Sequence, residues 1–394
     1  MTTGKRDHTL GIWALTLGYY LFYVPYSGIS KAVTSGLLTG GQAIPGTELL
    51  PAAGISTAIT VLLFITAMRW WKYGCQRRVF GLSVVVPRQQ TLISGIGFAA
   101  IIFTTTLAYS FSGISILLAL VLMRAGVLII SPIIDRFFSR RIRWFSWTGL
   151  MLSLVTLAIS LTNVHEYQLS LAALLNLAAY LSGHALRIPA MTQIAKTGEP
   201  EAALGYFVEE QAVAMLLLIC FPCVVALLGR GEIANEFRVG LAHLFSGPIG
   251  LAGGTIGLFY AGLGICLSFI YLDRRENTFC MPLFACSSLL SGITASYLLA
   301  WWMHGPKPHG MEIGAGLLLI VALLIMSPLH HLPLYIKQLR NAIAEHRLIL
   351  VDFKKNPSSK PAPSLAGSSA TRFITINFDA MREVLRNPPT ERQS

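Results

Sequence analysis

The stretch Tyr109–Arg143, YSFSGISILLALVLMRAGVLIISPIIDRFFSRRIR, decides the class of the fold. Residues 112–134 form an apolar run of 23 residues, which is long enough to cross a bilayer as a helix. Arg124 is the single charge within this run. A central Arg costs roughly 2.5–3.5 kcal/mol on insertion scales, so the position requires a buried partner or a function. Asp135 and a cluster of arginines follow the run, and such a cluster is typical of the cytoplasmic face.

The composition of the whole chain is that of a membrane protein. Of the 394 residues, 54% are hydrophobic and only 12% are charged, against about 25% charged in a soluble domain. The net charge is +12, but Lys and Arg concentrate at the ends of apolar runs, which argues against a nucleic-acid partner. The six cysteines lie mostly in or beside apolar runs, so no secreted disulfide framework is expected. The first apolar segment lacks a convincing cleavage site and is predicted to be a retained helix rather than a signal peptide.

Ten apolar runs predict ten membrane-spanning helices. Their expected positions are 10–30, 47–68, 91–110, 112–134, 144–161, 168–187, 203–228, 247–272, 278–302 and 310–330. With the amino terminus inside, the outer loops carry only four basic residues, namely Lys31, Arg230, Arg238 and Lys307. The positive-inside rule therefore predicts that both termini are cytoplasmic. We expect the cell inner membrane as the location.

The ten runs divide into two halves of five. Because five is odd, the second half enters the membrane from the opposite side, as in transporters built from inverted repeats. The expected organisation is an all-α polytopic protein with a first half at 1–164 and an inverted second half at 165–333. The segment 334–394 is predicted to be a basic cytoplasmic tail, partly disordered because 356–371 is rich in Pro, Ser and Ala. The basic charge of this tail either favours contact with anionic lipid or only helps to keep the tail on the cytoplasmic side.

Residues 107–135, LAYSFSGISILLALVLMRAGVLIISPIID, and 144–161, WFSWTGLMLSLVTLAISL, resemble the drug/metabolite transporter superfamily of EamA type. The shared features are a short helix hairpin, a fourth helix with small residues and an acidic end, and a fifth helix that opens with an aromatic residue and Gly. The resemblance implies ten helices in two inverted halves around a cavity. The sequence departs from the family at Arg124, where Pro is common, in its long loop 229–246, and in its tail.

Two further spans carry polar residues at helical spacing. Span six has Asn176, Tyr180, His184 and Arg187, which lie on one helix face and are predicted to line a cavity or to pack against another helix. Span one has Tyr19, Tyr23 and Tyr26 at spacings of four and three. These tyrosines either pack against neighbouring helices or contact a substrate. The candidate substrate-binding residues are Arg124, Asn176, Tyr180, His184, Tyr19 and Tyr23.

Glu209 and Glu210 lie near the start of span seven. Adjacent carboxylates in apolar surroundings repel each other's ionisation, which suits proton coupling, whereas pairing with Arg124 or Arg187 would keep one charged. Both roles stay open at this stage, as does a solvated helix end. In span eight, Gly250, Gly253, Gly254 and Gly257 form GxxxG pairs that predict close helix packing. A homodimer is also an open possibility.

The sequence motifs give little support to an enzymatic function. Ser182-Gly183-His184 is similar to one motif of lipid-phosphate phosphatases, but the accompanying basic motifs are absent, and no HxxxxD acyltransferase motif or metal constellation occurs. We therefore expect no catalytic residues, no metal and no cofactor. The expected function is alternating-access transport of a small metabolite, either anionic or amphipathic. The alternatives are a flippase for a lipid or lipid-linked intermediate, and a non-transporting protein or enzyme of envelope-lipid metabolism.

Overall fold

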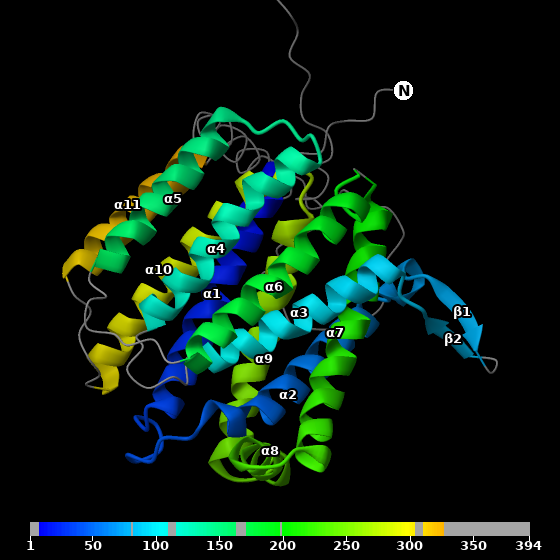
Figure 1. Cartoon of the computed structure of the whole chain (residues 1–394), viewed down its shortest axis with the longest axis vertical. Coiled ribbons are helices and arrows are strands. Elements are labelled where there is room, and N and C mark those ends of the chain that lie inside the picture. The colour runs from blue at the N-terminus through cyan, green and yellow to red at the C-terminus, as the bar shows by residue number, and fades with distance from the viewer. Residues whose placement is uncertain are drawn as a thin grey trace, which may run out of the picture. The chain divides into compact units, whose positions relative to one another are not determined.

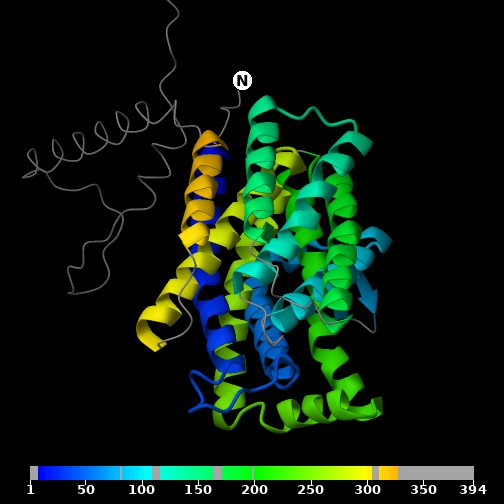
Figure 2. The same ribbon diagram turned by 60° about the vertical axis from the view of Figure 1, so that its left-hand side comes forward.

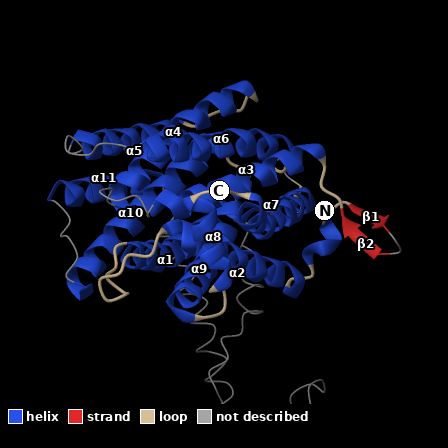
Figure 3. Cartoon of the chain, turned by 60° about the horizontal axis from the view of Figure 1, so that its bottom comes forward, coloured by secondary structure: helices blue, strands red, loops and turns tan. Residues whose placement is uncertain are grey.

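The computed structural model describes residues 8–79, 82–108, 116–162, 171–197, 199–303 and 310–326. Over these residues the chain is almost entirely helical (Figure 3). The elements, in chain order, are α1 (His8–Thr34), α2 (Gly46–Ala67), the 3-10 helix η1 (Trp70–Tyr73), β1 (Gln76–Val79), β2 (Leu82–Val85), α3 (Gln89–Ala108), α4 (Ile116–Phe137), α5 (Trp144–Thr162), α6 (Leu171–Ile194), α7 (Pro200–Leu228), α8 (Glu232–Ala242), α9 (Gly247–Leu272), α10 (Asn277–Met303) and α11 (Gly310–Met326).

The helices belong to one compact unit, Ile12–Ser327. The other unit consists of Met1–Gly11 and Pro328–Ser394, and only His8–Gly11 of it is among the described residues. The predicted cytoplasmic tail, 334–394, therefore lies outside the part of the chain that the structure describes.

Each of the ten predicted apolar runs coincides with a long helix in the described residues. The agreement is closest at α9, which occupies the predicted 247–272. It is weakest at α6, which was predicted at 168–187 and is observed at Leu171–Ile194. Within the described residues, six helices, namely α2, α3, α6, α7, α9 and α10, are long and apolar enough to cross a membrane. The chain is thus a largely helical, multi-pass membrane protein.

Two elements within the predicted loops were not expected, a short β-hairpin and the helix α8. The segment 69–90 contains an antiparallel hairpin in which Gln76 of β1 pairs with Val85 of β2 (Figure 1). The loop 229–246 contains α8, which lies across the ends of longer helices (Figure 2). Helix α8 buries Ala234, Phe237 and Gly240, so its apolar residues recur every three positions and cover the end of α2.

Small residues allow the helices to approach closely. A Cβ atom on Gly97 of α3 would lie 2.6 Å from the carbonyl oxygen of Gly183 on α6, and the reverse contact has the same length. Gly253 and Gly257 of α9 face α2 in the same way, against Ala52 and Ala53. Among lipid-exposed helices such contacts replace the hydrophobic effect as the source of association. The closest pairs are α2 with α9 and α3 with α6, followed by α4 with α10 and α5 with α11.

Candidate functional site

Arg124 is buried in the middle of the bundle, with only 2% of its surface exposed. Its Nε atom donates a hydrogen bond to Oγ of Ser288 on α10 at 2.9 Å, and Nη2 donates to the hydroxyl of Tyr23 on α1 at 3.1 Å. Nη1 donates to the hydroxyl of Tyr180 on α6. One side chain on α4 therefore connects three other helices through neutral hydroxyl groups.

Aromatic rings complete the surroundings of this guanidinium. Its central carbon lies 4.2 Å from the ring centroid of Phe284 and 5.6 Å from that of Tyr180. The Tyr23 ring is 6.0 Å away. A cation over an aromatic face is stabilised by about 2 kcal/mol or more when it is desolvated, so these rings offset part of the cost of burying the charge.

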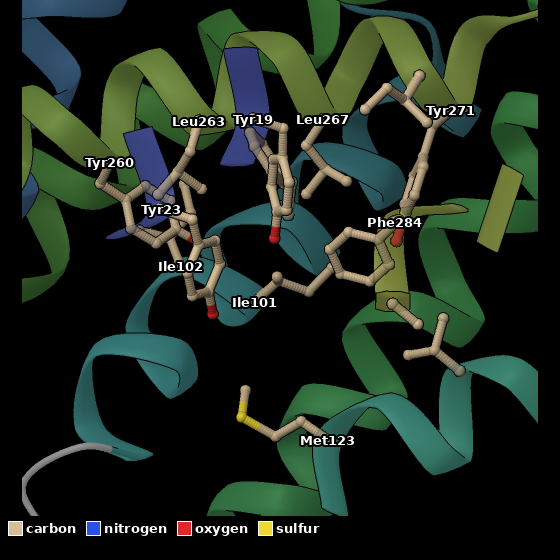
Figure 4. Close-up of a cluster of buried hydrophobic side chains, with 14 of the residues drawn as sticks. Tyr19, Tyr23, Ile101, Ile102, Met123, Tyr260, Leu263, Leu267, Tyr271 and Phe284 are labelled. Atoms are coloured by element: carbon tan, nitrogen blue, oxygen red, sulfur yellow. The ribbon is translucent and has the colours of Figure 1, made fainter. Parts of the chain in front are cut away.

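Several buried polar atoms next to Phe284 have no hydrogen-bond partner in the described part of the chain. They are the hydroxyls of Tyr19 and Tyr271 and both ring nitrogens of His184. Their rings lie 5.5, 5.4 and 6.3 Å from the Phe284 ring. Figure 4 shows Tyr19 and Tyr271 on either side of Phe284. Buried polar groups are rarely left unpaired, and each one costs about 1–3 kcal/mol. The arrangement therefore offers donors and acceptors that the protein itself does not use.

The four residues of the predicted polar stripe on α6 contact different parts of the protein. Tyr180 and His184, whose ring centroids are 4.6 Å apart, belong to the surroundings of Arg124. Asn176 instead donates from Nδ2 to the backbone oxygen of Thr104 on α3 at 3.0 Å. Arg187 binds Glu210. Of the six predicted substrate-binding residues, the structure thus brings together Arg124, Tyr180, His184, Tyr19 and Tyr23, and it places Asn176 in a contact with α3.

Arg187 and Glu210 form a fully buried ion pair between α6 and α7. Nε and Nη2 of Arg187 each lie 2.8 Å from a different carboxylate oxygen of Glu210, which is bidentate geometry. The Glu210 carboxylate also accepts hydrogen bonds from Ser94 on α3 and from Tyr206, and Nη2 of Arg187 donates to Ser268 on α9. Four helices therefore meet at this pair. Of the two arginines that the sequence offered as partners for these carboxylates, Arg187 is the one that binds Glu210, and Arg124 does not.

Glu209 holds the β1–β2 hairpin against the bundle. Its carboxylate accepts hydrogen bonds from Nε and Nη2 of Arg88 at 3.1 and 3.2 Å, and from the hydroxyl of Thr91 at 2.7 Å. The backbone N–H groups of Arg88 and Cys75 also donate to it, so it caps the start of α3. Glu209 is therefore engaged by Arg88 at the end of the bundle, and the alternative in which it pairs with Arg124 does not hold.

A polar network that the sequence did not predict joins α4, α5, α6 and α10 at one end of the bundle. The buried carboxylate of Asp135 accepts hydrogen bonds from the backbone N–H groups of Asn277 and Thr278, which caps α10. Asn277 also donates to Thr192 on α6 at 2.9 Å. Such N-capping is worth about 1 kcal/mol even at exposed helices.

Glu276 continues this network just before α10. Its carboxylate accepts hydrogen bonds from Nε of Arg143 at 2.9 Å and from the hydroxyl of Ser146 at 2.6 Å. Burial by itself raises the pKa of the Glu276 carboxyl, but the hydrogen bonds from Arg143 and Ser146 outweigh burial and hold the pKa below its usual range. This carboxylate is therefore charged at neutral pH and ties the loop before α5 to the loop before α10.

Sequence reasoning missed three residues around Arg124, namely Tyr271, Phe284 and Ser288. They are isolated polar or aromatic residues in apolar helices, where packing is the usual role. The sequence did contain one relevant signal: a buried Arg124 needs hydroxyl and aromatic neighbours, and such residues in other spans were candidates for that role. Within the described residues, no group of three or more His, Cys, Asp or Glu side chains is placed to hold a metal ion.

Comparisons with known proteins add little to this geometry. No family model matches the chain, and no curated protein matches it. Solved structures of 26 chains do match. One of them, described as "Crystal structure of protein", is 14% identical and has a TM-score of 0.47, with 82% of this chain and 98% of that chain covered. At this identity and score the likeness carries no argument about function.

Proposed function

We propose that this protein is a membrane transporter that binds the anionic group of a small substrate at Arg124. The observation that carries the proposal is the set of unpaired polar atoms beside a buried guanidinium, contributed by Tyr19, His184 and Tyr271 from three different helices. A carboxylate or phosphate group accepts hydrogen bonds from Arg and Tyr, and charge-assisted bonds of this kind are the strong ones. A scaffold protein gains nothing from polar groups in this position.

The packing of the helices supports two inverted halves, α1–α5 and α6–α11 without α8. In such an arrangement α2 corresponds to α7, α4 to α10 and α5 to α11, and each of these corresponding pairs is in contact. In the same arrangement α9 corresponds to α3. The contact of α2 with α9 therefore has a counterpart in the contact of α7 with α3, and both contacts are present. The site then lies between the halves, since Arg124 and Tyr23 come from the first and Tyr180 and Ser288 from the second.

The burial of the site supports an alternating-access mechanism. Arg124, Tyr180 and His184 are almost fully enclosed, so a substrate reaches them only after helices move apart. At the end of the bundle near Asp135, the capping of α10 and the ion pair of Glu276 with Arg143 tie the loops together. The distribution of Lys and Arg supports a cytoplasmic location for this end, and in this proposal both termini lie on the same side of an inner membrane. We propose that the enclosed form opens at either end in turn.

The same layout is in keeping with the drug/metabolite transporter superfamily that residues 105–161 resemble. This proposal includes ten membrane spans, a cytoplasmic position for both termini, and membership in that family. A homodimer and lipid contacts of the basic tail remain predictions.

Transport currents test the proposal. Purified protein in proteoliposomes on a solid support would be exposed to a panel of carboxylates and phosphates and to their neutral amides and alcohols. Arg124→Gln is the test variant, because Gln can still bond to the hydroxyls of Tyr23 and Tyr180, and Arg136→Gln is the matched control at an exposed position of α4. We expect anion currents that fall roughly 10- to 100-fold in Arg124→Gln only, which corresponds to the loss of about 1.5–3 kcal/mol. Equal transport of neutral analogues, with Arg124→Gln unaffected, would refute the proposal.

A further inference from the structure

Residues of α1, α9 and α10, together with Leu38 and Thr39, line a concave apolar groove. Its volume is about 570 Å³, which falls within the roughly 300–1,000 Å³ range of small-ligand pockets. Its lining combines small residues, including Gly28 and the buried Ala32 and Ala295, with the exposed Leu251 and Trp302, so we take the small residues as its base. We call it the α1–α9–α10 groove. It is separate from Arg124, because the tyrosines of α1 that surround Arg124 do not line it.

The lining excludes a polar ligand. Two hydroxyl groups belong to it, those of Thr39 and Thr255, and both are engaged within the protein. Thr255 donates to the backbone oxygen of Leu251 at 2.7 Å, and Thr39 donates to that of Gln42. Apart from the Trp302 indole and the Met303 thioether, the remaining lining side chains are hydrocarbon, so the groove suits a hydrocarbon chain.

Apolar contact does not by itself select one lipid molecule, because the surrounding acyl chains are as apolar as the groove. Selection has to come from steric fit and from the headgroup. The small base residues provide a recess between exposed side chains, since Leu251 and Trp302 are 77% and 71% exposed. Trp301 and Trp302 stack on each other at 6.1 Å, and exposed Trp residues are typical of the headgroup level of a membrane.

A basic residue stands between lining residues in the sequence of α1. Lys31 follows Gly28 by three positions in α1 and directly precedes Ala32, so it belongs to the margin of the same helix face. It is in the last turn of α1, at the end of the bundle where the two exposed Trp residues lie in α10. Lys side chains near helix ends extend towards the headgroup region, where they attract phosphate.

We propose that the α1–α9–α10 groove is a binding site for one anionic phospholipid, with an acyl chain in the recess and the headgroup phosphate at Lys31. With the amino terminus in the cytoplasm, this lipid belongs to the outer leaflet. The inference does not depend on the proposed transport of anions, since it involves no residue of the Arg124 site.

Native mass spectrometry of the full chain tests the site. The protein would be reconstituted in nanodiscs of phosphatidylcholine with one tenth phosphatidylglycerol and then released, and the retained lipid would be counted and identified. Gly28→Leu fills the recess, and its added Cβ meets only Ala295 at 3.8 Å, an ordinary contact. Gly254→Leu is the matched control on α9, because nothing lies within 4 Å of a Cβ atom there. Circular dichroism would establish that both variants are folded.

We expect the wild type and Gly254→Leu to retain one phosphatidylglycerol, and Gly28→Leu to lose it. Lys31→Gln should retain a lipid but lose about fivefold in preference for the anionic headgroup, because one Lys near an anionic surface contributes about 1 kcal/mol. The same retention in folded Gly28→Leu as in the wild type would overturn the site. Retention without headgroup preference in the wild type would overturn the assignment of an anionic lipid.

Discussion

The ion pair of Arg187 and Glu210 gives the sharpest prediction about stability. Both side chains are fully buried, and Glu210→Gln would leave the Arg187 guanidinium with Ser268 and one amide oxygen in place of a bidentate carboxylate. Removing one member of a buried pair costs about 3–5 kcal/mol, because the remaining charge is uncompensated. We therefore expect Glu210→Gln to lower the free energy of unfolding by that amount.

A double variant separates the charge from the packing. In Arg187→Met with Glu210→Leu no charge is left in the site, so more than half of the loss should be recovered. The assay is denaturant unfolding in detergent micelles, followed by circular dichroism, with exposed Arg136→Gln as a control that should change stability by less than about 0.5 kcal/mol. A loss below about 1 kcal/mol in Glu210→Gln, or a double variant no better than the single one, would refute the reasoning.

Three further predictions concern the ends of the bundle. Glu209→Gln should release the hairpin and speed trypsin cleavage at the exposed Arg77, measured by mass spectrometry, whereas unchanged cleavage would show that other contacts hold the hairpin. Because the folded-state pKa of Glu276 is lowered, its contribution to stability is present above about pH 4.3 and is lost as the pH falls through the folded-state pKa. The unfolding free energy of Glu276→Gln should therefore fall less steeply on acidification than that of the wild type, and parallel curves would contradict this. Reporter fusions should behave as cytoplasmic at Cys75 and as external at Asn235, and an external signal at Cys75 would end the inverted-repeat interpretation.

The positions of the helices were predictable because a membrane makes apolar length nearly sufficient to identify a helix. The hairpin was not, since β1 and β2 have four residues each and their sequences, QRRV and LSVV, show no pattern against the surrounding basic loop. Helix α8 carried a usable signal in the spacing of Ala234, Phe237 and Gly240, which the interpretation of the segment as a loop overlooked.

The site was predictable only where polar residues recur on one helix face. The stripe on α6 identified Tyr180 and His184, and the buried charge identified Arg124. Which arginine pairs with Glu210 depends on the rotation of α4 and α6 about their own axes, and close contacts such as that of Gly97 with Gly183 fix this rotation. A single sequence does not contain such pairwise information. For the same reason Phe284 could not be told apart from an ordinary core residue.

The measurement that tests the central claim most directly is ligand-induced stabilisation at the Arg124 site. Thermal unfolding of the purified protein would be followed with a panel of small carboxylates and phosphates, in the wild type, Arg124→Gln and Arg136→Gln. A ligand at 100 times its Kd stabilises the folded state by about 2.7 kcal/mol. We predict that at least one anion raises the melting temperature of the wild type and of Arg136→Gln, and that it leaves a folded Arg124→Gln protein unchanged. An equal rise in all three proteins would show that the anion binds elsewhere and would contradict the account.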